Sequence, residues 1–137
     1  LDFRHFANMG AKPGKILAIN FRTKLGIGDV PYTELPSIGS DNNLRAYYGG
    51  RYRDQNSMYA LVEYRHTFNK KVGLSKHGFV VWTGAGEIWN DQIELKNTLP
   101  VVGVGYRFAL QPRINLRVDV GVGRDSFGFY LNITEAF

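Results

Sequence analysis

The chain of 137 residues contains no cysteine and no long apolar run. Without cysteine, disulfide frameworks, thiolate nucleophiles and cysteine-ligated metals are excluded. A transmembrane helix needs roughly 18 or more apolar residues in succession, and no stretch of this sequence approaches that length. A membrane-spanning β-strand needs only every second residue to be apolar, so its mean hydropathy is close to neutral. The lack of a long apolar run therefore excludes a helical membrane protein, but it does not exclude a membrane-spanning β-barrel.

Motifs of common enzyme sites are missing as well. The three histidines, His5, His66 and His77, have no spacing typical of a metal site. There is no nucleophile elbow and no phosphate loop, and the Gly-x-Gly pairs lack the third glycine and the helix of a dinucleotide fingerprint. The sequence predicts a protein that is not an enzyme and that has no cofactor and no metal.

Positive charge is in moderate excess, with 17 Lys and Arg against 12 Asp and Glu, for a net charge of +5. The basic residues are dispersed along the chain and mostly alternate with apolar ones. This pattern favours basic side chains in a polar interior and on loops over a nucleic-acid-binding surface. We therefore expect no nucleic-acid partner.

Nine Phe, eight Tyr and sixteen Gly favour strands joined by turns. Apolar and polar residues alternate with a period of two in several segments, the pattern of a strand with one apolar face. The clearest is Arg113–Arg124, where Arg117 and Asp119 share the polar face and are expected to pair. The run Phe79–Trp82 is apolar on both faces, so we expect it to be covered on both sides. The predicted strands are Asp2–Asn8, Lys15–Gly28, Ser57–Phe68, His77–Gly86, Val101–Phe108, Arg113–Arg124 and a last one from Phe127 to Ile133.

The two faces of these strands differ in a way that predicts their surroundings. Charges such as Glu63, Arg107 and Asp119 gather on the polar faces together with glycines, whereas the apolar faces are large and almost free of charge. A hydrated interior and a lipid-facing exterior fit this pattern. The sequence thus predicts an all-β, antiparallel outer-membrane β-barrel over residues 1–137. A soluble ligand-binding barrel of the lipocalin type is the alternative, with the apolar faces inside.

Seven strands are an odd number, and a closed bacterial single-chain barrel normally has an even number. We expect these strands to belong to a larger barrel, or to an eight-stranded one whose first strand is missing or is supplied by a partner. The chain opens on Leu1 without an initiator Met. A processed chain, a trimmed one or the tail of a longer one is therefore expected.

The link at residues 29–56 is too long for an ordinary connection without secondary structure, and such links are usually functional or disordered. Its aromatic and Arg content argues against disorder. Glycines on the predicted interior faces would leave a bare patch of wall for an inserted link, or would relieve curvature in a tightly closing sheet. These glycines are Gly84, Gly86, Gly103, Gly105, Gly121, Gly123 and Gly128.

The end of the sequence has apolar residues at alternate positions and closes on phenylalanine. The pattern is formed by Phe129, Leu131, Ile133 and Phe137. It resembles the C-terminal assembly signal of outer-membrane barrels, which is recognised by pairing to a sheet edge. An ordinary edge strand that ends in Phe is the alternative.

The motif Leu44-Arg45-Ala46-Tyr47 in the long link resembles the Arg-Gly-aromatic motif in a loop of the Omp85 (bacterial surface antigen) family, with Ala46 in place of the usual Gly. The segment Val62-Glu63-Tyr64-Arg65 is similar to the family's next strand. In Trp82–Gly86, Gly84 stands where many members have an acidic residue. The resemblance covers nearly the whole chain and corresponds to the last strands of the family's barrel.

This resemblance implies that the loop folds into the lumen and that Arg45 pairs with Glu63 on the inner wall. With Gly84 at the acidic position, Arg45 would lack a second anchor, and stacking on Trp82 or Tyr47 is expected to compensate.

The resemblance also implies a bacterial outer-membrane location and a role in outer-membrane protein biogenesis or in translocating a polypeptide or lipid. The expected partners are outer-membrane lipid and lipopolysaccharide, the barrel assembly machinery, and other outer-membrane proteins or a second copy. A membrane anchor or structural barrel without transport activity is the alternative.

Overall fold

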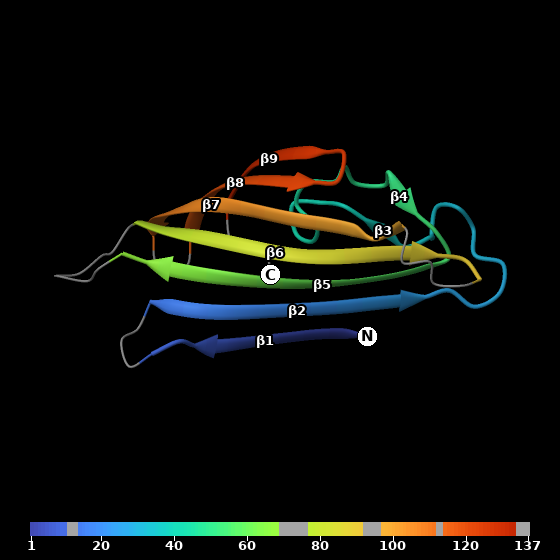
Figure 1. Cartoon of the computed structure of the whole chain (residues 1–137), viewed down its shortest axis with the longest axis horizontal. Helices are drawn as coiled ribbons and strands as arrows, with labels where there is room; N and C mark the ends of the chain where they lie inside the picture. The colour runs from blue at the N-terminus through green and yellow to red at the C-terminus, as the bar shows by residue number, and fades with distance from the viewer. Residues whose placement is uncertain (11–13, 69–76, 92–96, 112–113, 134–137) are drawn as a thin grey trace.

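The computed structural model describes residues 1–10, 14–68, 77–91, 97–111 and 114–133. They form an all-β structure, and no helix occurs among them (Figure 1). In this part of the chain there is no helix long and apolar enough to span a membrane. The strands are β1 (Asp2–Asn8), β2 (Lys15–Leu25), β3 (Ser37–Ile38), β4 (Tyr52–Arg53), β5 (Asn56–Thr67), β6 (His77–Trp89), β7 (Leu99–Gln111), β8 (Ile114–Gly123) and β9 (Phe127–Ile133).

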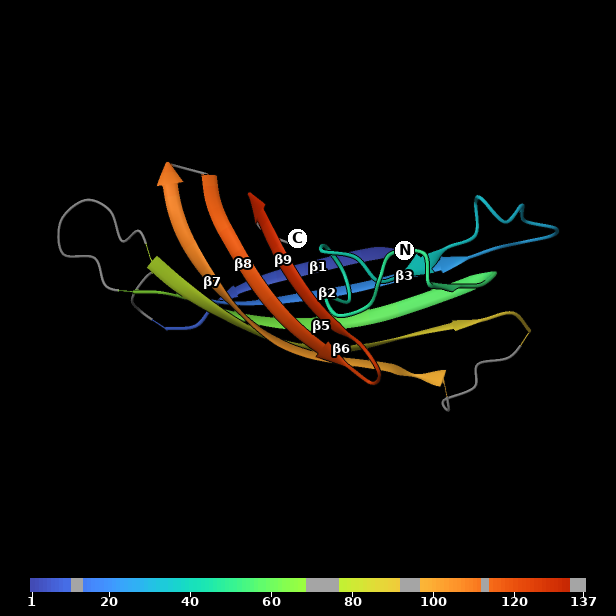
Figure 2. The ribbon, with the colours of Figure 1, turned by 90° about the horizontal axis from the view of Figure 1, so that it is seen from above.

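Seven of these strands form one antiparallel sheet in the order β1-β2-β5-β6-β7-β8-β9. Each strand pairs with its sequence neighbours in the sheet, so β1 and β9 form the two edges of the described sheet. The sheet is curved, and the link between β2 and β5 lies against its concave face (Figure 2). All seven predicted strands are confirmed. β6 and β7 run further than predicted, and the first long strand ends at Leu25 rather than at residue 28.

The predicted assignment of polar and apolar residues to opposite faces is also confirmed. On β8, Arg117 and Asp119 are buried on the concave face, whereas Val122 is exposed on the convex face. On β7, Arg107 is buried while Val104 is exposed. A water-soluble sheet normally shows the reverse, with charges outside and apolar residues inside. The chain therefore buries its charges on one side of the sheet and exposes its large apolar residues on the other.

The expectation that β6 is covered on both sides is wrong. Trp82 is 1% exposed on the concave face, but its neighbour Val81 is 41% exposed on the convex face. The four apolar residues Phe79–Trp82 simply alternate between the two faces of the pleated strand. Among the described residues, only the concave face receives a covering layer.

That layer is the link between β2 and β5, which contains secondary structure that its sequence did not predict. β3 and β4 pair through Ser37 with Arg53 and Ile38 with Tyr52. The apolar core of the chain lies between this link and the concave face, so the link is packed against the sheet rather than solvated. Its buried members are Ile38, Leu44, Ala46, Tyr47, Tyr59, Leu61, Val80, Trp82, Leu99 and Val101.

Candidate functional site

One row of residues crosses the concave face and forms the floor of the candidate site. The pairing register places Glu63 of β5 beside Trp82 of β6, and Trp82 beside Gly103 of β7. The row continues through Gly121 of β8 to Gly128 of β9. Residues that lie directly opposite each other on paired strands share a face of the sheet, so all five positions of this row are on the concave face. Two large side chains are thus followed by three positions without any side chain.

These glycines make room for particular groups. A Cβ atom at Gly121 would collide with the backbone carbonyl of Arg45, and one at Gly103 would collide with the indole ring of Trp82. At Gly123 the added atom would lie 2.5 Å from Cζ of Tyr47. Since Cβ atoms rarely approach backbone atoms so closely, the link can pack in this position only because residue 121 is a glycine.

Arg45 lies at the centre of the site, at 0% exposure. Its Nη2 donates a hydrogen bond to Oε2 of Glu63, and its Nη1 donates one to Oδ2 of Asp119 at 2.8 Å. The guanidinium carbon lies 3.7 Å from the ring centroid of Trp82. Charge-assisted hydrogen bonds and cation–π contacts are both strengthened when water is excluded. The site therefore holds one cation between two carboxylates and an indole ring.

The expected contact of Arg45 with Glu63 is present, and so is the expected stacking on Trp82. Tyr47 is not stacked on Arg45: its hydroxyl donates a hydrogen bond to the Pro100 carbonyl at 2.5 Å and accepts one from the Arg124 amide at 3.0 Å. Burial raises the pKa of the Tyr47 phenol above its ordinary value.

The expectation that Arg45 lacks a second acidic anchor is wrong. Gly84 carries no carboxylate, but Asp119 reaches the same guanidinium from β8, two strands away from β6 in the sheet. Gly84 itself does not anchor the link, because the side-chain atom closest to its added Cβ is Cδ1 of Leu61, at 2.8 Å, on β5. The second carboxylate that Arg45 contacts is therefore at position 119 rather than at position 84.

Further arginines surround the two carboxylates. Arg107 and Arg117 both form ion pairs with Asp119, the latter from Nε at 3.3 Å, so the expected pairing of Arg117 with Asp119 is present. Arg65 donates from Nε to Oε1 of Glu63 at 2.6 Å. The same Arg117 donates from Nη2 to the Asp41 carbonyl of the link at 3.0 Å. The link is therefore fixed to the wall through charged groups of β5 and β8, and Arg107 of β7 pairs with one of these groups, Asp119.

Sequence reasoning missed Asp119 as a partner of Arg45. Alternation placed Asp119 on the same face as Gly121, where the link was expected to lie, but alternation contains no information about the register between strands. That register places Asp119 beside Gly105 of β7, close to the row of glycines.

The other residues of the predicted motif are also buried. Leu44 belongs to the apolar core, and the Ala46 carbonyl accepts a hydrogen bond from Oγ of Ser126 at 2.6 Å. In the predicted assembly signal, Phe129, Leu131 and Ile133 are exposed on the convex face. Phe137 lies outside the described residues.

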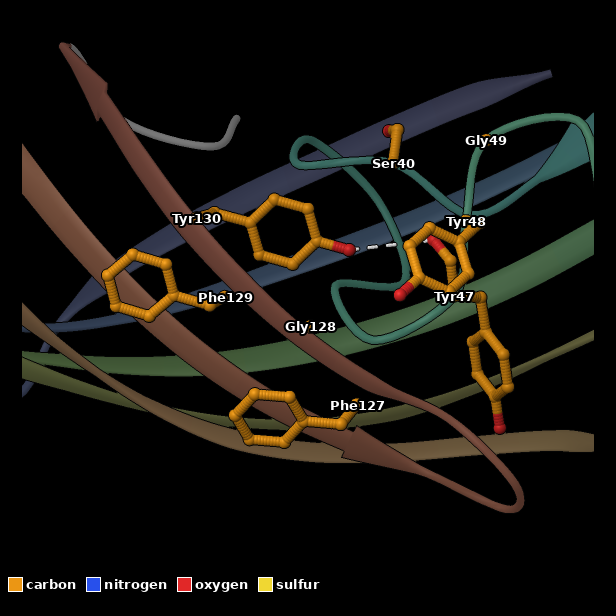
Figure 3. A pocket seen from close by; sticks show the side chains of 8 residues that line it. All are labelled: Ser40, Tyr47, Tyr48, Gly49, Phe127, Gly128, Phe129 and Tyr130. Carbon is orange, nitrogen blue, oxygen red and sulfur yellow. Dashed lines mark hydrogen bonds between the residues drawn. The ribbon is translucent and has the colours of Figure 1, made fainter.

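An aromatic groove of about 320 Å³ lies beside the edge strand β9, between that strand and the link (Figure 3). The Tyr130 hydroxyl points across the groove to the Tyr47 carbonyl, at 3.5 Å, whereas Phe127 and Phe129 lie on the other side of β9. The groove is lined by Ser40, Tyr47, Tyr48, Gly49, Phe127, Gly128, Phe129 and Tyr130. It follows the edge of the sheet that the described residues form.

Within the described ranges, no group of three or more His, Asp or Glu side chains is placed to hold a metal ion. His66 packs on Phe79, and His77 packs on Phe108.

Comparison of the chain with protein-family models, curated proteins and solved structures finds no match.

Proposed function

We propose that this chain is a segment of a bacterial outer-membrane β-barrel of the Omp85 type, with Arg45 holding an inserted loop against the inner wall. The observation that carries this proposal is the burial of Arg45 between Glu63 and Asp119 on the concave face. A long surface link has no need of a buried cation. A loop that must stay inside a water-filled barrel gains both position and rigidity from one.

The convex face supports a lipid environment. Its large apolar side chains are exposed on five successive strands, whereas Glu63, Arg107, Arg117 and Asp119 are buried on the opposite face. Exposed apolar surface on this scale marks contact with lipid or another protein. Charges inside and apolar residues outside together match a membrane barrel with a polar lumen, and they argue against a soluble ligand-binding barrel.

Aromatic side chains form a band on the convex face at one end of the strands. Phe79 of β6 contacts Tyr64 and Phe68, and His77 contacts Tyr106 and Phe108. Aromatic girdles of this kind lie at the membrane–water interface in outer-membrane barrels. The band supports strands that cross the membrane with this end at an interface.

The direction of the edge strands supports a larger or completed barrel. In an antiparallel sheet of seven strands, β1 and β9 run in the same direction. Closure in the pattern of the rest of the sheet therefore requires an odd number of additional strands. An eighth strand, or the strands of a larger barrel, would meet this requirement.

The functional role that we infer is outer-membrane protein biogenesis or the translocation of a polypeptide or lipid, with outer-membrane lipid, lipopolysaccharide and the barrel assembly machinery as partners. The link between β2 and β5, which Arg45 holds in place, lies beside β9 at the edge of the described sheet. A strand of a polypeptide that is being inserted or translocated would pair with this edge. A static anchor is favoured by one feature only, the complete burial of Leu44, Arg45 and Tyr47, which fills the concave face.

An Arg45→Ala variant separates these two roles. If the loop controls a passage, the variant in planar lipid bilayers should show a conductance at least several-fold higher or more variable than the unaltered protein, because the loop has lost two charge-assisted hydrogen bonds. Arg51→Ala, at an exposed position of the same link, is the matched control and should behave as the unaltered protein. Equal conductance of all three proteins, with no defect in outer-membrane assembly in cells, would contradict a transport role and favour a membrane anchor without transport activity.

A Val118→Arg variant tests whether the convex face of the sheet is in contact with lipid. Val118 lies in the middle of β8 on the convex face, beside Leu131 of β9. If it faces the bilayer near its midplane, Arg should lower the free energy of unfolding in lipid by about 2–4 kcal/mol, whereas Val122→Arg near the strand end should lower it by about 0–1 kcal/mol. Urea unfolding in lipid vesicles measures both values. Two equally small effects would show that the convex face meets water.

A further inference from the structure

Glu87 is a carboxylate in an unexpected place. It is on the convex face of β6, as are the exposed residues Val81 and Thr83, yet it is only 3% exposed. Its Oε1 is buried and accepts no hydrogen bond within the part of the chain that the structure describes. A buried carboxylate oxygen without a donor is costly, because burial removes water and no described residue donates a hydrogen bond in its place. A donor from outside the described residues would fill this acceptor and offset that cost.

A hollow of about 240 Å³ opens beside this carboxylate. Its floor includes Ala60 of β5 and Ala85 of β6, which are direct neighbours in the register. Phe21 lies next to Ala60 on β2, and Met58 lies next to Glu87, so larger side chains border the two alanines. Small residues between large ones leave an apolar depression with one acidic group in its wall.

The position of the hollow fits a lipid headgroup. Glu87 lies two residues before Trp89, the last residue of β6, and is therefore close to the end of the strand. In a membrane barrel the strand ends lie at the headgroup level, where charge is least costly and aromatic residues are frequent. A headgroup at Glu87 would leave its acyl chain free to run over Ala85 and Ala60 toward the middle of the bilayer.

We propose that this hollow binds a membrane lipid with a primary-ammonium headgroup, whose N–H groups donate to the Glu87 carboxylate. The inference rests on the proposed membrane function, since the hollow faces lipid only if the chain crosses a bilayer. Opposite charge and three N–H donors favour a primary ammonium over a phosphate or glycerol headgroup. A trimethylammonium group has the charge but no N–H donor for Oε1.

Native mass spectrometry of the full chain in detergent micelles measures this binding, with phosphatidylethanolamine as the probe. Phosphatidylcholine and phosphatidylglycerol of the same acyl chains are the comparison lipids. Phosphatidylethanolamine is expected to bind about tenfold more tightly than either, the change that the loss of one charge-assisted hydrogen bond produces.

Two variants test the two halves of the site. Glu87→Gln keeps the shape and removes the charge, and Ala85→Leu keeps the charge and fills the hollow. Each is expected to weaken phosphatidylethanolamine binding about tenfold and to leave phosphatidylglycerol binding unchanged. Glu34→Gln, at an exposed position of the link, is the control and should not affect either lipid. Equal unfolding midpoints of the variants and the unaltered protein show that they are folded.

The inference and the proposed function can fail separately. If the unaltered protein resists alkaline extraction from vesicles but binds the three lipids equally, the chain is a membrane protein and the headgroup site is overturned. The same holds if neither Glu87→Gln nor Ala85→Leu changes the preference. If the protein is extracted as a soluble chain, the proposed function fails first and the headgroup site fails with it.

Discussion

An Asp119→Asn variant should lower the free energy of unfolding by about 3–5 kcal/mol, the usual consequence of breaking a buried ion pair. Asp119 is completely buried and forms ion pairs with Arg45, Arg107 and Arg117. Asparagine has nearly the same shape, but it removes the negative charge around which three guanidinium groups are gathered. The variant therefore leaves like charges close together in a region from which water is excluded.

Urea unfolding in detergent micelles measures this change. Asp2→Asn is a matched control, because Asp2 also lies between two arginines, Arg4 at 3.0 Å and Arg22 at 3.4 Å, but is one-third exposed. Exposed ion pairs contribute little to stability, so this control should unfold almost as the unaltered protein does. Similar small changes in both variants would mean that water reaches Asp119 and that the network does not brace the link.

The seven strands of the large sheet could be predicted, and so could the separation of polar from apolar residues on them, because both follow from a period of two. The pleat of a β-strand places alternate residues on opposite faces whatever the rest of the chain does. Arg117, Asp119 and Gly121 therefore had to share a face once β8 was identified. Their separation from Val118 and Val122 was fixed by the same geometry.

The partners across the site could not be predicted in this way. Arg45 and Asp119 are 74 residues apart, and their contact depends on the path of the link and on the register of four strands. The hairpin of β3 and β4 was missed because two residues are too short to show a period. Arg45 with Glu63 was expected only through a family resemblance, and the same resemblance pointed to Gly84 rather than Asp119.

A substitution at Gly121 tests most directly whether the link packs on the concave face. The two explanations for the glycines predict changes of opposite sign in the free energy of unfolding. If Gly121 only relieves curvature, Gly121→Ala removes a flexible residue from a strand and should stabilise the sheet by roughly 0.5–1 kcal/mol. If the link lies on it, the new methyl group meets the Arg45 backbone carbonyl, which cannot rotate away as a side chain can. We then expect a loss of about 1–3 kcal/mol from overpacking, or more if the link is expelled and the ion pairs of Arg45 break.

The matched control is Gly128→Ala, since Gly128 lies beside Gly121 in the same row. There the added atom would meet the ring of Tyr130, a side chain that can move, so the loss should be smaller. Trypsin provides a second measurement: Arg51 is exposed and should be cut in every variant, whereas Arg45 is buried and should be cut rapidly only in Gly121→Ala. Because expulsion of the link exposes Arg45 but increased stability of the sheet does not, faster cleavage after Arg45 together with a lower free energy of unfolding would establish that the link rests on Gly121. A more stable Gly121→Ala variant with Arg45 still protected would show that the glycine serves the curvature of the sheet.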